Sequence, residues 1–123
     1  MEKVIYQILK NYREIVYLMD KLNDFDLKSY LEKKGVYGPD DMDNSIVDKI
    51  KEATEELKNY PTSRALDMST IIEENYLSSE NKKLEDVAGE LGLTSANAYR
   101  LRRKAIHYIA ILISETKEEA VIS

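Results

Sequence analysis

Residues 94–104 hold the densest group of hydrogen-bonding and cationic side chains, in the order Thr-Ser-Ala-Asn-Ala-Tyr-Arg-Leu-Arg-Arg-Lys. Four of the last five positions are arginine or lysine. An asparagine amide can pair with the edge of adenine, an arginine guanidinium can pair with the edge of guanine, and both lysine and arginine bind phosphate groups. A single helix that presents these side chains together can therefore bind a nucleic acid.

The preceding residues predict how that helix is positioned. Residues 83–91 have the apolar spacing of a short helix, in which Ala88 is small enough to let another helix cross closely. Gly92 follows four residues later, where the chain must adopt a left-handed conformation that glycine reaches at little cost. Thr94 or Ser95 then supplies the oxygen that caps the next helix.

In the second helix Ala98 and Leu101 are expected to face inward, six and nine residues after the glycine. This is the spacing of a helix-turn-helix, whose second helix enters the major groove of DNA. The residues expected to contact DNA are Thr94, Ser95, Ala96, Asn97, Tyr99, Arg100, Arg102, Arg103, Lys104, Lys82 and Lys83.

These residues are expected to divide into two groups. Asn97 is expected to bond an adenine edge, and Arg100 or Arg103 a guanine edge. The expected phosphate contacts, which position the protein without specifying sequence, are Arg102, Lys104, Lys82 and Lys83. A plain helical hairpin with a solvated charged face is the alternative, because it would also need a short helix, a glycine and a second helix.

The charge of the chain is distributed unevenly. The net charge is −5 and the isoelectric point is about 5.0. Residues 82–113 nevertheless hold six cations and three acids, whereas residues 1–81 hold 11 cations and 17 acids. Salt limits the reach of each charge to about 10 Å. The overall acidity therefore does not exclude DNA binding by the basic segment.

Composition favours an all-helical fold. A chain of 123 residues can bury a core of its own, and 43% hydrophobic with 33% charged residues is typical of a folded chain. Four glycines and two prolines are too few for the many tight turns of a sandwich or barrel. We therefore expect an all-α protein.

The N-terminal region is expected to form a helical hairpin. Apolar residues in 2–22 recur at alternating spacings of three and four, which predicts one long helix, and residues 26–34 predict a short one. The apolar seam consists of Ile5, Ile8, Tyr12, Ile15, Met19 and Leu22. It could pack onto its own domain, which is the commoner outcome, or form a short coiled coil that makes a homodimer.

Gly35, Gly38 and Pro39 mark a loop after this hairpin. We place a boundary in this loop. The expected divisions are an N-terminal region at 1–43, a DNA-binding module at 44–115 and an acidic tail at 116–123.

Two helices are expected between this loop and the helix-turn-helix. The first begins with Asn44 or Ser45 as its cap. Pro61 ends the first helix, because the residue before a proline disfavours the helical conformation. The second helix is capped by Thr62 or Ser63 and runs to about Leu77.

The sequence offers little for catalysis or for a metal ion. There is no cysteine, and His107 is the only histidine, so neither thiolate ligation nor a two-histidine metal site is possible. Acidic pairs such as Glu55–Glu56 and Glu73–Glu74 are expected on solvated helix faces. We therefore expect no enzymatic activity, no metal and no cofactor.

The sequence predicts neither a membrane span nor a signal peptide. The longest unbroken apolar run, Tyr108 to Ile113, is far shorter than the roughly 20 residues of a membrane span. The first residues include an early acid and lack the cleavage pattern of a signal peptide. We expect a cytoplasmic protein with no membrane partner.

Two stretches carry a family resemblance, ALDMSTIIEENYL at 65–77 and KLEDVAGELGLTSANAYRLRRKAIHYIA at 83–110. The region from about Asn44 to Ile113 resembles the phage-encoded late-gene transcriptional regulators of the ArpU and RinA type, whose C-terminal half is similar to the fourth region of bacterial sigma factors. The matching positions are Ala88, Leu91, Gly92 and Leu93 in the scaffold and turn, 95–103 in the reading helix, and Lys104 and Ala105 after it. Residues 94–98 depart from the family pattern, so no base preference carries over.

The resemblance implies a sequence-specific regulator that binds double-stranded DNA and activates phage late genes, such as packaging or lysis genes, with RNA polymerase nearby. Two alternatives remain. One is the DNA-recognition small subunit of a phage packaging terminase, which would form a ring. The other is a helical adaptor that binds a basic protein partner through the acidic helices expected at 44–59 and 65–77.

Overall fold

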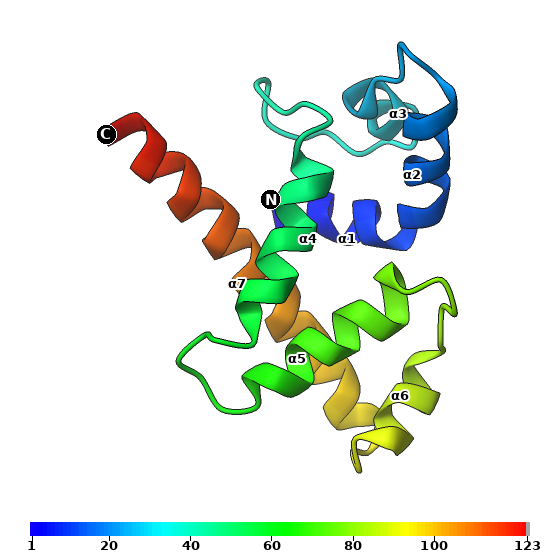
Figure 1. The fold of residues 1–123 in the computed structure, drawn as a ribbon, viewed down its shortest axis with the longest axis vertical. Coiled ribbons are helices and arrows are strands. Elements are labelled where there is room, and N and C mark those ends of the chain that lie inside the picture. The colour runs from blue at the N-terminus through cyan, green and yellow to red at the C-terminus, as the bar shows by residue number, and fades with distance from the viewer. Residues whose placement is uncertain (123) are drawn as a thin grey trace.

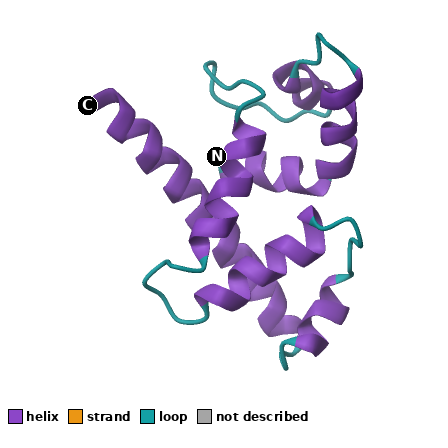
Figure 2. Cartoon of the chain, in the orientation of Figure 1, coloured by secondary structure: helices purple, strands orange, loops and turns teal. Residues whose placement is uncertain are grey.

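The protein is all-helical in the part of the chain that its computed structural model describes, which is the backbone of residues 1–122 and the side chains of residues 1–114. This part contains seven α-helices, one π-helical segment and no strand (Figures 1 and 2). In chain order they are α1 (Glu2–Lys10), α2 (Tyr12–Lys21), α3 (Leu27–Lys33), α4 (Ile46–Leu57), α5 (Ala65–Ile72), η1 (Glu73–Leu77), α6 (Leu84–Glu90) and α7 (Ser95–Ile122).

Helix α7 is the element on which the others are assembled. It contacts α1, α4, α5 and α6, and in Figure 1 it passes behind α4 and α5 along the length of the molecule. Ala98, Ala105 and Ile109 of α7 are fully buried. Burial of such apolar surface is the dominant favourable contribution to folding. The start of α7 is therefore held in a fixed orientation by the body of the protein.

The N-terminal region differs from the single helix expected over 2–22. It is broken at Asn11, and α1 and α2 run in different directions on either side of it (Figure 1). Asn11 has φ −107° and ψ 17°, outside helical values, and its side-chain amide donates to the carbonyl of Gln7 at 2.8 Å. Asparagine tolerates such a break, because its side chain can bond backbone groups that the helix leaves free. The prediction of one continuous helix was wrong at this residue.

The bend changes the role of the apolar seam. Ile5, Ile8 and Ile15 have no exposed surface and belong to the core of the chain itself. Beyond the bend, Tyr12 and Met19 are partly buried against the same core, whereas Leu22 is 46% exposed. The centre of the seam is therefore an internal packing surface, and the bend at Asn11 interrupts the straight stripe that a coiled coil would use.

The loop expected as a boundary connects two parts of one core. A single cluster of buried residues runs from Val4, through Val36, to Ile113. Helix α1 also contacts α7 directly. The residues at 116–122 continue α7 as backbone, while the side chains of the expected acidic tail lie outside the described residues.

Helices α4 and α5 begin without the side-chain caps that the sequence predicts. Helix α4 begins after Ser45, but the Asn44 side chain bonds Leu27 N and Phe25 O, at 2.8 and 2.7 Å, and so holds α3 against the loop. Hydrogen bonds from Ser45 lower the pKa of Asp43. The Asn44 side chain thus makes a long-range contact and does not cap α4.

Helix α5 also departs from expectation at both ends. It begins after Arg64, which has φ +63° and makes no side-chain cap, so neither Thr62 nor Ser63 has the predicted role. The helix does continue to Leu77, but residues 73–77 form a π-helical turn in which Ser78 N donates to Glu73 O at 2.7 Å. This turn faces α1, α2 and α6.

Within the described residues, no helix is long and apolar enough to cross a membrane.

Candidate nucleic-acid interface

The turn between α6 and α7 has the geometry that the sequence predicts. Gly92 has φ +69°. Leu93 N donates to Ala88 O at 2.8 Å and Gly92 N donates to Gly89 O at 3.3 Å. This pair of bonds is the Schellman motif, which ends a helix with a left-handed residue and satisfies its last carbonyls. The left-handed glycine is confirmed.

The next helix begins at Ser95, immediately after this turn. Its cap is Thr94, whose Oγ1 accepts a hydrogen bond from Asn97 N at 3.1 Å. Such a cap satisfies one of the free N–H groups at a helix start and is typically worth about 1 kcal/mol. Ser95 and Ala96 at this end are exposed, and free N–H groups at a helix start favour a negatively charged ligand.

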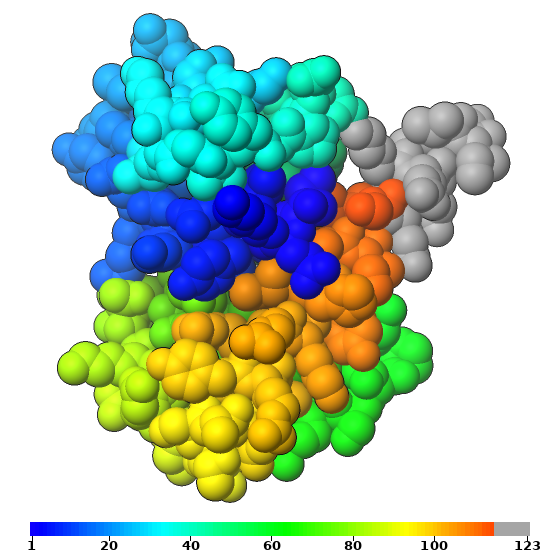
Figure 3. Space-filling view, turned by 180° about the vertical axis from the view of Figure 1, so that it is seen from behind, coloured from blue at the N-terminus to red at the C-terminus, as the bar shows by residue number. Residues whose placement is uncertain are grey.

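Helix α7 separates apolar and polar residues as expected. Ala98 is fully buried and Leu101 is 9% exposed, while Ala88 of α6 is 2% exposed. The outward positions on this helix start are all exposed: Thr94, Ser95, Ala96, Asn97, Tyr99, Arg100, Arg103 and Lys104. Figure 3 shows this stretch, in yellow to orange, as one end of the visible face of the molecule.

Asn97 and Arg100 form a pair on this face. Arg100 Nη1 donates to Asn97 Oδ1 at 3.1 Å, across one turn of the helix. The contact restricts both side chains, so less rotational freedom is lost when either binds a partner. Two of the three residues considered for reading bases thus lie together in the first two turns of α7, and the third, Arg103, is exposed one turn further along.

Arg102 lies differently from the other cations of α7. It is partly buried, and its Nη1 donates to Asn75 Oδ1 in η1 at 3.0 Å. Its guanidinium carbon is 4.9 Å from the ring centre of Tyr99 and 5.6 Å from that of Tyr76. Arg102 therefore links the start of α7 to η1, in addition to the phosphate contact predicted for it.

Replacement of Arg102 by alanine is expected to lower the free energy of unfolding by about 2–4 kcal/mol. This is the range of a hydrogen bond from a charged group together with partly exposed cation–π contacts. Arg103→Ala is the matched control, because Arg103 is exposed and its replacement removes the same charge. Urea denaturation of the two variants checks this, and equal unfolding free energies would contradict the linking role.

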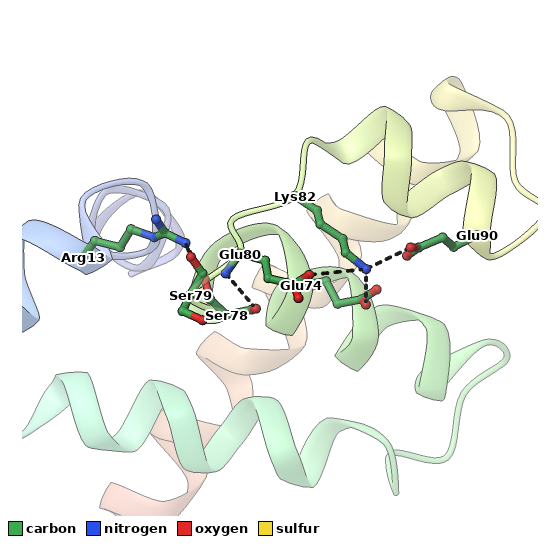
Figure 4. Close-up of polar contacts among 7 residues, drawn as sticks. All are labelled: Arg13, Glu74, Ser78, Ser79, Glu80, Lys82 and Glu90. Atoms are coloured by element: carbon green, nitrogen blue, oxygen red, sulfur yellow. Dashed lines mark hydrogen bonds and ion pairs between the residues drawn. The ribbon is translucent and has the colours of Figure 1, made fainter.

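Lys82 is held among three carboxylates (Figure 4). Its Nζ lies 2.8 Å from Glu90, 3.2 Å from Glu74 and 3.8 Å from Glu80. Hydrogen bonds to Glu90 and Glu74 raise the pKa of this lysine. A phosphate contact by Lys82 would require it to leave these carboxylates. Lys83, by contrast, is exposed at the N-cap of α6.

Arg13 is a residue that sequence reasoning missed. Its Nη2 donates to the carbonyl oxygens of Ser78, at 2.7 Å, and Ser79, so α2 is bound to the segment that leads into α6 (Figure 4). An isolated arginine on a helix expected over residues 2–22 gives no signal for such a contact, which spans 65 residues of sequence. Lys82 and Arg13 together hold α6 and the segment that leads into it against η1 and α2.

The described residues contain no group of three or more histidine or acidic side chains placed to hold a metal ion. His107 is exposed, and its Nδ1 lies 3.2 Å from Glu2 Oε2. This contact joins the surface of α7 to the first turn of α1.

Comparisons with known proteins add no family to these observations. Neither protein-family models, nor curated proteins, nor solved structures gave a match to this chain. The inference about function therefore depends on the geometry of α6 and α7 and on the residues that carry the family resemblance.

Two glycines of α6 and its turn are expected to respond oppositely to alanine. Gly92→Ala should lower the free energy of unfolding by about 1–2 kcal/mol, because the left-handed conformation is costly for other residues. Gly89→Ala should raise it by about 0.5–1 kcal/mol, because Gly89 lies in the helix and an added methyl group would meet no atom within 4 Å. Thermal and urea denaturation check both, and a loss of stability in Gly89→Ala would contradict this geometry.

Proposed function

We propose that this protein is a sequence-specific DNA-binding regulator of transcription. The observation that carries the proposal is the start of α7. There a glycine turn and a threonine cap present eight exposed residues, Asn97 and Arg100 among them, on a helix whose other face is buried. A recognition helix needs this combination of a fixed orientation and an exposed polar N-terminal half.

In this proposal the first turns of α7 enter the major groove of double-stranded DNA. Asn97 bonds the edge of an adenine, and Arg100 bonds the edge of a guanine. Ser95 and Ala96 are exposed and small, so the helix can approach the bases closely. Arg103 and Lys104 lie one turn further along and bind phosphate groups.

The surroundings of the helix set limits on the strength of binding. Glu85 and Asp86 are exposed in the first turn of α6, and Tyr99 OH lies 3.5 Å from Glu85. Lys82 keeps its charge, but that charge is compensated by Glu74 and Glu90. Carboxylates therefore surround part of the basic segment, and non-specific binding by this acidic protein is expected to be weak and sensitive to salt.

The regulatory part of the proposal depends on the family resemblance. The protein would activate phage late genes, such as those for packaging or lysis, by binding upstream of them close to RNA polymerase. Genes for packaging proteins beside the gene for this chain would support that role.

Selection from a pool of random DNA duplexes tests the proposal, because it requires no known target sequence. The full chain is expected to enrich one short motif over successive rounds, and Arg100→Ala is expected to reduce the enrichment at one position of that motif. Enrichment of no motif, with no shift of the pool in an electrophoretic assay at about 50 mM salt, where phosphate contacts are strong, would refute DNA recognition.

A further inference from the structure

A basic groove lies beside the start of α7. It has a volume of about 320 Å³ and is formed between α1 and α7. Lys3 of α1 and both Arg102 and Arg103 of α7 line it, with Glu2 as the acid in the lining. Figure 3 shows α1, in blue, directly beside the first part of α7 on one face of the molecule. We call this the α1 groove.

A second groove of about 440 Å³ continues from the first. It extends past the bend at Asn11 to η1, and Tyr6 and Arg102 line both grooves. Its cations are Lys10, Arg13 and Arg102, and its acid, Glu14, accepts a hydrogen bond from Tyr30. The two grooves together thus have five cations and two acids in a chain whose net charge is −5.

Lys3 and Lys10 are the cations that α1 offers to a partner on this surface, beside Arg103 of α7. Arg13 and Arg102 already donate to groups of the protein. Lys3 and Lys10 are exposed, and among the side chains described neither forms an ion pair. They are seven residues apart in α1, so they lie on the same helix face, roughly 10 Å from each other.

We propose that Lys3 and Lys10 bind the phosphate backbone of the DNA that flanks the segment read by α7. This inference rests on the proposed function and extends the DNA footprint from α7 onto α1. Arg103 lies both on the exposed face of α7 and in the α1 groove, so a strand leaving the major groove past Arg103 passes Lys3 next. An extended polyanion fits this surface, because its cations lie on α1, α2 and α7 along two grooves that share Tyr6 and Arg102.

The dependence of binding on salt measures these contacts. Each phosphate contact contributes about 0.9 to the slope of log affinity against log salt concentration. The double variant Lys3→Gln/Lys10→Gln is therefore expected to have a slope smaller by about 2. Between roughly 50 and 200 mM salt, the fold-loss of affinity for the selected duplex should be about ten times smaller in this variant than in the wild type. The preferred motif should not change, because phosphate contacts carry no base information.

The matched control is Lys33→Gln/Lys51→Gln, which removes two exposed lysines of α3 and α4 that line neither groove. The control should keep the wild-type slope to within about 0.5, which is well below the change expected for two phosphate contacts. All three proteins should have the same thermal midpoint. A slope in the Lys3/Lys10 variant equal to that of the control would overturn the proposal while leaving recognition by α7 intact. Failure of the wild type to bind any duplex would instead refute the proposed function, and the inference with it.

Discussion

Arg100→Ala is expected to weaken binding to the selected duplex by tenfold or more, and Asn97→Ala by a similar factor. A bidentate contact to a base edge is worth about 1–3 kcal/mol, and about 1.4 kcal/mol corresponds to tenfold in affinity. Both side chains are exposed in the first two turns of α7, where a recognition helix reads bases. Each variant should also lose discrimination at one base pair of the motif, because its contact carried that information.

The double variant Asn97→Ala/Arg100→Ala is expected to lose less than the product of the two single losses. Residues in contact are not independent, and Arg100 donates to Asn97 at 3.1 Å. Titrations of fluorescent duplex with the four proteins form a double-mutant cycle that measures this coupling. Lys33→Ala is the control for charge, because Lys33 lies in α3, at the opposite end of the molecule from α6 in Figure 1. Equal losses in Lys33→Ala and Arg100→Ala would mean that only net charge matters.

Ile8→Ala is expected to lower the free energy of unfolding by about 2–5 kcal/mol, the usual range for truncation of a fully buried isoleucine. Ile8 belongs to the same core cluster as Ile71 and Ile109, so the loss should appear in one cooperative transition of the whole chain. Urea denaturation followed by circular dichroism measures it. Val16→Ala is the control, with an expected change within about 0.5 kcal/mol, because Val16 is 40% exposed.

The same two variants distinguish internal packing from dimerisation through the seam. The mass of the protein in solution, from sedimentation or light scattering, should be the same for wild type and Ile8→Ala under folding conditions. A dimer that Ile8→Ala converts into a stable folded monomer would contradict the packing of α1 onto α7. Val16→Ala and Ile8→Ala with equal stabilities would contradict it as well.

The features that could be predicted from the sequence are those set by residues close together in the chain. The Gly92 turn, the Thr94 cap and the burial of Ala98 depend on neighbours within one or two helical turns. Their physical causes are left-handed backbone, side-chain capping and apolar spacing, each of which has a local signature. The exposed face of α7 follows from the same spacing.

The features that could not be predicted depend on contacts between distant residues. Asn11 is as compatible with a helix surface as with a break, and the choice is made by packing of α1 and α2 on the core. Asn44 has the composition of a cap but bonds α3 instead. Tertiary contacts override local propensity in both cases.

The sequence also could not predict which cations at the candidate interface are already paired. Lys82 and Lys83 are identical in the sequence, yet Lys82 is held by Glu74 and Glu90 whereas Lys83 is exposed. Arg102 and Arg103 differ similarly, since Arg102 bonds Asn75 in η1. A count of cations along the chain therefore overstates the charge available to DNA, and only the fold identifies which cations are already paired.

The central claim is that the first turns of α7 bind DNA, and amide chemical-shift mapping of the full chain tests it most directly. Titration with the selected duplex is expected to shift the signals of residues 94–104 most strongly, with smaller shifts at the start of α6 and along α1. The amides of α3 should be unaffected, because α3 lies at the far end of the molecule (Figure 1). Shifts centred on the acidic faces of α4 and α5, or no shifts at concentrations well above those used in the selection, would contradict the claim.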